Sequence, residues 1–286
     1  PDCEDFMLEL SSLLYANEEL QRRINSLVSH PQANDIYWLS LSGENNLLSL
    51  CTAPLSVAGI LQQELFSAKE CVVLTGATLS TEGNFEYIKR RLGLEEANEL
   101  TLGSPFDYLG STMIYVPGDI PEPGQPGYQP GVEKAISELC GSSRGRALVL
   151  FTSHAALKTT LAAIRVPLAA DGILVLGHGV DGSPKQLLET FKIEPKAVLL
   201  GTSSFWEGVD VVGEALSVLI IARLPFNVPT DPIFAARSEL FPNPFNQYAL
   251  PQAALRFKQG FGRLIRSKND RGIMVVLDSR LKHKSY

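Results

Sequence analysis

Two arginines and a glutamine near the end of the chain have the residue types and spacing of a phosphate-binding group. Gln259, Arg263 and Arg266 follow one another at intervals of four and three, which places them on one face of an α-helix. Guanidinium groups keep their charge and present a fork of donors that matches phosphate oxygens, and Gly260 and Gly262 allow close approach. The pattern predicts a site for a polyanion such as the terminal phosphates of a nucleotide.

A second block, residues 201–210, reads Gly-Thr-Ser-Ser-Phe-Trp-Glu-Gly-Val-Asp and follows an apolar run. It therefore lies at the carboxyl end of an expected strand, where open α/β sheets bind ligands. Hydroxyl groups of Thr202, Ser203 and Ser204 and free backbone N–H groups suit phosphate oxygens. Glu207 and Asp210 are candidates to order water or magnesium, or to hold an arginine in place.

A third block, residues 74–80, reads Leu-Thr-Gly-Ala-Thr-Leu-Ser and ends the apolar run of residues 71–74, which we expect to be a strand. Its small, hydroxyl-rich turn contains Thr75 and Thr78 and is suited to relaying contacts between neighbouring units. Taken alone, it is only a strand end with a helix cap.

The elements that must position these blocks follow from apolar patterning. Residues 4–28 have helical periodicity and predict one long helix or a helical pair. Further on, apolar strands alternate with helices, which predicts a parallel sheet with helices on both faces. Expected strands are 36–42, 47–51, 112–116, 147–151, 173–176, 197–200, 216–222 and 272–277; expected helices are 57–66, 132–139, 251–265 and those beginning at His154 and Lys185.

Composition describes a soluble globular protein of about two compact units. The chain has 286 residues, 45% hydrophobic and 20% charged, and no apolar run long enough to span a membrane. Its four cysteines, Cys3, Cys51, Cys71 and Cys140, have no metal-binding spacing and indicate isolated thiols in a reducing, cytosolic compartment.

The net charge of −6 is unevenly distributed. Residues 1–50 contain eight acids and two bases, whereas residues 251–286 contain nine bases and two acids, a net of +7. Positive charge is thus concentrated in the segment that contains Arg263 and Arg266, where phosphates are expected.

Taken together and in this order, the three blocks resemble the DinG/XPD family of superfamily-two DNA helicases. Residues 75–79 are similar to its (S/T)-(A/G)-T-L motif, 205–210 to its W-E-G-x-D motif and 259–266 to its Q-x-x-G-R-x-I-R motif. Asp278-Ser279-Arg280 matches its D-x-R ending. Further landmarks are residues 53–55 (Ala-Pro-Leu), 104–106 (Ser-Pro-Phe) and 223–226 (Arg-Leu-Pro-Phe).

The resemblance implies a RecA-like α/β domain, preceded by a helical amino-terminal segment, that works in ATP-driven unwinding. Arg266 would be the arginine finger, and Arg263 and Gln259 would sense the nucleotide. Coupling and nucleotide contacts would come from Glu207, Gly208, Asp210, Thr75 and Thr78. Single-stranded DNA would contact Thr202, Ser203 and Ser204, with Phe205 or Trp206 stacking on bases, although these two rings fit a core role equally well.

Several family parts are absent from this sequence. No glycine is followed by lysine, so there is no phosphate loop, and there is neither a D-E-x-H motif nor the four-cysteine iron–sulfur motif. The resemblance therefore predicts the carboxyl-terminal part of a helicase: residues 1–46 as the end of an arch insertion, 47–95 as the last strands of the first motor domain and 96–286 as the second. ATP and Mg²⁺ would be shared with the rest of the first motor domain, and the chain alone would be inactive. No metal site, iron–sulfur cluster or membrane contact is expected within the chain. The expected location is the bacterial cytoplasm, in association with the nucleoid.

Two other classes of function remain open. Gly177, Gly179 and Gly182 match the dinucleotide fingerprint G-x-G-x-x-G, which would make the chain an NAD-binding oxidoreductase domain, although Ser183 and Pro184 separate the glycines from the next helix. A non-catalytic module that binds DNA or protein would keep the same fold.

Residues 141–145 spell G-x-S-x-G but follow a helix, so we expect a turn there rather than a nucleophile elbow. The four histidines form no zinc-binding pattern and are interpreted as structural or surface residues.

Overall fold

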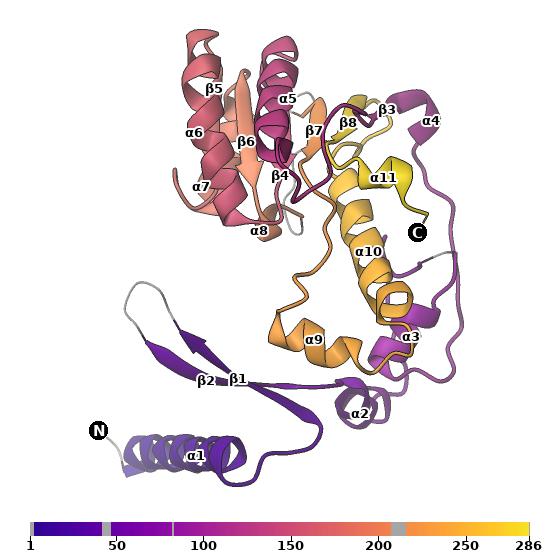
Figure 1. Ribbon diagram of the computed structural model, residues 1–286. Coiled ribbons are helices and arrows are strands. Elements are labelled where there is room, and N and C mark those ends of the chain that lie inside the picture. Colours follow the sequence, from indigo (N-terminus) through magenta and orange to yellow (C-terminus); the bar gives the residue numbers. More distant parts are fainter. Residues whose placement is uncertain (1–2, 42–46, 82, 207–215, 286) are drawn as a thin grey trace. The chain divides into compact units, whose positions relative to one another are not determined.

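The computed structural model describes residues 3–41, 47–81, 83–206 and 216–285, and the chain divides into two compact units (Figure 1). The first unit comprises Pro1–Thr75, Phe85–Ala97 and Asn227–Phe245, and the second comprises Gly76–Asn84, Asn98–Phe226 and Asn246–Tyr286. None of the helices in the described ranges has the length and apolar content needed to cross a bilayer.

The first unit is built from helices and one antiparallel β-hairpin. Its elements are α1 (Cys3–Val28), β1 (Asp35–Leu41), β2 (Leu48–Pro54), α2 (Ala58–Leu61), the π-helical turn η1 (Gln62–Phe66), α3 (Glu86–Leu92) and α9 (Pro232–Ser238). The expected amino-terminal helix is confirmed as one continuous helix. Strand β1 pairs with β2 from Asp35 opposite Pro54 to Leu41 opposite Leu48.

Segment 227–245 lies between two strands of the second unit in sequence but packs within the first. Arg237 of α9 donates through Nε to the Leu55 carbonyl at 3.2 Å and through Nη2 to the Pro54 carbonyl at 2.8 Å. The Arg90 guanidinium lies 4.3 Å from the centre of the Phe241 ring. The two Arg237 hydrogen bonds hold Pro54 and Leu55 of the Ala-Pro-Leu landmark in place. The sequence did not predict helices α9 and α3.

The second unit contains a six-stranded parallel sheet in the order β3-β8-β7-β4-β6-β5. Its strands are β3 (Thr112–Tyr115), β4 (Ala147–Leu150), β5 (Leu174–Gly177), β6 (Ala197–Gly201), β7 (Val218–Ile221) and β8 (Gly272–Val276). Its helices are α4 (Tyr108–Ser111), α5 (Tyr128–Ser142), α6 (His154–Ala170), α7 (Pro184–Ile193), α8 (Ser203–Trp206), η2 (Phe245–Ala249), α10 (Leu250–Phe261) and α11 (Arg280–His283). The predicted RecA-like α/β architecture is confirmed.

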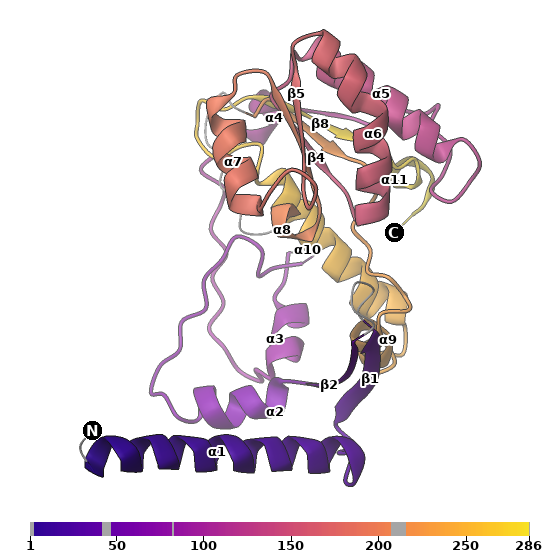
Figure 2. The same cartoon turned by 90° about the vertical axis from the view of Figure 1, so that its left-hand side faces the viewer.

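Helices cover both faces of this sheet, as the uninterrupted apolar strands require (Figure 2). One core joins the sheet to α5 and α6 through Ile136, Leu157 and Ile164. The opposite core joins it to α7 and α8 through Phe191 and Phe205. The parallel strands place all their carboxyl ends at one edge, where the predicted site residues are expected.

One predicted strand is wrong. Residues 71–74 have no regular secondary structure and pair with no described strand, and Val73 is 80% exposed. A strand is stable only where neighbouring strands satisfy its backbone groups, and no strand in the described part of the chain does so for this segment.

Candidate functional site

The carboxyl edge of the sheet collects polar residues from three neighbouring strands. Ser153 caps α6 directly after β4, His178 follows β5, and Thr202 follows β6. Ser203 and Ser204 open α8 with exposed side chains, so they are placed where the sequence analysis expected them. This edge is therefore polar and accessible at the two serines.

Thr202 is buried, and its hydroxyl lies between two imidazole rings. Its Oγ1 is 3.0 Å from Nε2 of His154 and 2.8 Å from Nδ1 of His178, and the ring centres are 5.1 Å apart. Burial, and then the proximity of His154, lower the pKa of His178 from its ordinary value. The neutral His178 ring can therefore donate a hydrogen bond to the Thr202 hydroxyl or accept one from it. This contact, with the one to His154, holds both imidazoles at the carboxyl edge of the sheet.

In the sequence, His154 and His178 form no zinc-binding pattern, and 24 residues separate them. The strand order β4-β6-β5 brings them together, since each follows a strand of the same parallel sheet. His178 directly follows β5, and His154 opens α6 a few residues after β4, so a position shortly after an apolar strand is the signal that identifies them.

Phe205 and Trp206 are core residues, with exposed fractions of 0% and 4%. The Trp206 indole N–H donates to the Phe151 carbonyl at 3.0 Å, which satisfies its only polar atom. Of the two roles left open above, this burial favours the core role, because base stacking would require either ring to leave the hydrophobic interior.

The glutamine and arginine block departs from the expected helix. Helix α10 ends at Phe261, Arg263 lies in the following turn, and Arg266 lies in a loop, so the prediction of one shared helical face is wrong. The turn begins where Gly260 and Gly262 weaken the helix and lets Leu264 and Ile265 enter the core.

The three sequence blocks nevertheless meet. Gln259 Nε2 lies 3.5 Å from Thr78 Oγ1, at the limit of a hydrogen bond, and Arg263 Nη2 donates to the Trp206 carbonyl at 3.1 Å. Thr75 is exposed, and Glu207, Gly208 and Asp210 lie outside the described residues. The tertiary structure thus brings residues 259–266 into contact with the blocks 74–80 and 201–210.

A carboxylate fixes the loop that presents Arg266. Asp270 accepts hydrogen bonds at 2.8 Å from the backbone N–H groups of Arg266 and Ser267 and at 2.7 Å from the Ser267 hydroxyl. Burial alone would raise the pKa of Asp270, but these hydrogen bonds outweigh it and lower the pKa. The loop backbone is therefore held by a charged group at neutral pH.

Gly260 lets α10 approach the core closely. A Cβ atom at Gly260 would lie 3.0 Å from Trp206 Cζ3 and 3.3 Å from Leu150 Cδ1, whereas one at Gly262 would have only ordinary contacts at 3.5 Å. A larger residue at position 260 would push α10 away from Trp206.

We expect Gly260→Val to lower the free energy of unfolding by about 1–3 kcal/mol, as overpacking of a filled core does. Denaturant titration followed by circular dichroism measures this. Gly262→Ala is the matched control and should change stability by no more than about 0.5 kcal/mol. Equal stability of the two variants would show that α10 does not rest on Trp206 as described.

Two further landmarks meet at a buried ion pair. Asp278 is fully buried and accepts from Arg280 through Nε at 2.9 Å and Nη2 at 2.6 Å, and from the Leu224 backbone N–H at 3.0 Å. The Arg280 guanidinium also lies 5.8 Å from the centre of the Phe226 ring. The D-x-R ending therefore holds the Arg-Leu-Pro-Phe segment after β7.

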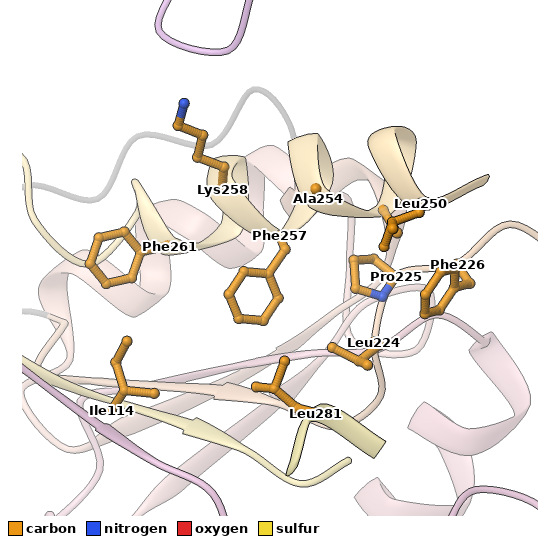
Figure 3. A pocket seen from close by; sticks show the side chains of 11 residues that line it. Ile114, Leu224, Pro225, Phe226, Leu250, Ala254, Phe257, Lys258, Phe261 and Leu281 are labelled. Atoms are coloured by element: carbon orange, nitrogen blue, oxygen red, sulfur yellow. The ribbon is translucent and has the colours of Figure 1, made fainter. Parts of the chain in front are cut away.

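An apolar cavity of about 460 Å³ lies beside α10. Figure 3 shows Phe257 and Phe261 pointing from α10 toward Ile114 and Leu281, while Lys258 points away from the cavity. Its walls offer no cluster of donors for phosphate, so this cavity supports the packing of α10 rather than binding a nucleotide.

The glycine fingerprint of residues 177–182 forms a strand-to-helix loop. The Gly177 backbone N–H donates to Asp181 Oδ2 at 2.7 Å, and Asp181 also pairs with Arg165. Helix α7 begins only at Pro184, after its cap Ser183. A pyrophosphate at this loop would meet an occupied donor and a carboxylate, so the oxidoreductase alternative is not favoured. The turn predicted at residues 141–145 is present only at residues 143–145, because α5 continues to Ser142.

No group of three or more His, Cys, Asp or Glu side chains in the described ranges is arranged to hold a metal ion. Cys51, Cys71 and Cys140 are free thiols, and burial raises the pKa of Cys140 to about 12. The donors assembled here, guanidinium, amide and hydroxyl groups, suit phosphate rather than a metal.

Comparison with known proteins relates this chain to helicases. Residues 136–286 match the family model described as helicase C-terminal domain. The chain is 35% identical to "3'-5' exonuclease DinG" of Bacillus subtilis over 96% of its length, and 36% identical to "ATP-dependent DNA helicase YoaA" of Escherichia coli over all of it. It spans only 32% and 45% of those relatives. A solved structure named "XPD_Helicase" has the same fold, with a TM-score of 0.63 and 19% identity over 82% of this chain and 43% of that one.

Proposed function

Because the chain belongs to the family of helicase C-terminal domains, as its DinG/XPD-like motifs indicated, we propose that it is the carboxyl-terminal motor region of an ATP-dependent DNA helicase. The observation that carries this proposal is the meeting of three sequence blocks, with Gln259 against Thr78 and Arg263 against the Trp206 carbonyl. Such contacts can transmit the state of a bound nucleotide to the carboxyl edge of the sheet.

In this proposal Arg266 is the arginine finger, which stabilises charge that develops on the γ-phosphate. ATP binds in the cleft between the two motor domains. Arg263 and Gln259 detect the nucleotide there and help the cleft to close. Glu207, Gly208 and Asp210, together with Thr75 and Thr78, couple closure to the grip on DNA. ATP and Mg²⁺ are shared with the first motor domain, where Mg²⁺ neutralises phosphate charge when bound.

Single-stranded DNA crosses the carboxyl edge in the same proposal. The exposed hydroxyl groups of Ser203 and Ser204 contact its backbone. Thr202 acts through its neighbours, since its buried hydroxyl is engaged by His154 and His178. Because the relatives are bacterial and one of them is named a DNA helicase, the proposal places the protein in the bacterial cytoplasm, associated with the nucleoid.

We assign residues 1–46 to the end of an arch insertion, 47–95 to the first motor domain and 96–286 to the second. Exposed apolar side chains along α1, such as Leu13 at 62% and Leu20 at 56%, fit a helix that packs against further parts of an insertion. The apolar residues 71–74 are not a strand in this structure, but they fit a segment that becomes one only beside strands of the rest of the first motor domain.

ATP hydrolysis by the isolated chain and by the full-length protein tests the proposal. The 286-residue chain alone is expected to show no DNA-stimulated hydrolysis, because it contains no phosphate loop. The full-length protein is expected to hydrolyse ATP when single-stranded DNA is added, as phosphate release assays measure. Hydrolysis by the isolated chain, or a full-length protein indifferent to DNA, contradicts it.

A further inference from the structure

A polar pocket of about 690 Å³ lies at the amino-terminal edge of the sheet, opposite the candidate site. Parallel strands β3, β4, β7 and β8 all begin there, beside the end of α5. Strands of four or five residues separate the two edges by about 13–17 Å. The pocket is therefore a distinct feature of the second unit.

Three arginines make this pocket strongly basic. Arg144, Arg146 and Arg271 line it with the hydroxyl-bearing residues Ser111, Ser142 and Ser217, and its lining contains no carboxylate. Within the ranges that the structure describes, none of the three guanidinium groups forms an ion pair. The carboxyl end of α5 carries only about half a negative charge, so most of the positive charge is uncompensated.

The backbone is strained where it presents two of these arginines. Arg144 and Arg146 have φ angles of +54° and +50° and flank Gly145 at +82°. A left-handed conformation costs a residue with a Cβ roughly 1–2 kcal/mol, and glycine or asparagine would be the less strained choice. Two arginines at such positions indicate that their charge is used.

We propose that this pocket is a second phosphate-binding site, which takes consecutive phosphodiester groups of a nucleic-acid strand. Arginine and serine are frequent partners of backbone phosphates. The lining contains no aromatic ring on which a base could stack, so the pocket has the chemistry to hold the backbone of a strand without reading its sequence. A site for a free nucleotide would need contacts to the base as well.

The proposal is tested by measuring how the affinity of the full-length protein for a labelled oligothymidylate depends on salt concentration, in the absence of ATP. Three lost phosphate contacts should reduce the slope of log affinity against log salt by about 2 and weaken binding about tenfold or more. The test variant is Arg144→Gln/Arg146→Gln/Arg271→Gln. Its charge-matched control is Lys134→Gln/Lys192→Gln/Lys282→Gln, whose exposed lysines lie outside the pocket and should leave the slope nearer to wild type.

Arg271→Glu is a second test variant, since Arg271 does not have a positive φ and is exposed. It should weaken binding more than Lys192→Glu does. Hydrolysis of ATP at saturating DNA should stay at the wild-type rate in all these variants, which separates this site from the proposed ATP cleft. An unchanged affinity and slope in the triple variant overturns the proposal. The proposal is also overturned if the triple variant binds oligothymidylate normally but no longer binds free ATP or polyglutamate. The pocket would then be a site for nucleotides or for acidic proteins.

Discussion

Replacing Arg266 by alanine in the full-length protein is expected to lower DNA-stimulated ATP hydrolysis by about a thousandfold or more, the effect of losing an arginine finger. The half-buried Arg266 follows a turn, and Asp270 holds its backbone N–H at 2.8 Å. The loop is thus ordered before nucleotide arrives, so little reorganisation is needed when charge develops on the phosphate.

The loss should appear mainly in kcat, with KM for ATP changed much less, because a finger acts chiefly in the transition state. Lys268→Ala is the matched control, since this exposed cation is two residues away and should leave hydrolysis unchanged. Steady-state phosphate release measures both variants. Full activity of Arg266→Ala would show that the finger is another residue.

The second large effect is expected on stability. Asp278→Ala should lower the free energy of unfolding by about 3–5 kcal/mol, the range for breaking a buried ion pair from one side. The change removes the acceptor for Arg280 and for the Leu224 backbone N–H. Both donors then lose a charged acceptor in or near the core.

Urea titration followed by tryptophan fluorescence measures this change. Asp119→Ala, an exposed aspartate in the same unit, should change stability by no more than about 0.5 kcal/mol. The free energy of unfolding of Asp278→Asn should lie between those of Asp278→Ala and Asp119→Ala, because the amide keeps one acceptor oxygen but loses the charge. Equal stability of Asp278→Ala and Asp119→Ala would mean that this pair does not hold residues 223–226.

Apolar patterning predicted most of the second unit correctly. Strands β4, β6 and β7 are fully buried, and such strands read as uninterrupted apolar runs whatever their neighbours are. The same logic failed at residues 71–74, because a strand also needs backbone partners that no local pattern reveals. Helices α3 and α9 were missed because each is only seven residues long and has too few turns for periodicity to appear.

By itself the sequence determined the α/β class and the three helicase-like blocks, because strand burial and motif spacing are local properties of the chain. Only the tertiary structure decided that Arg263 and Arg266 leave the helix and that Phe205 and Trp206 lie in the core. It also brought together His154 with His178, and Arg144 and Arg146 with Arg271, which are far apart in sequence. Such groups depend on the order of strands in the sheet, which is set by long-range packing rather than by any local pattern.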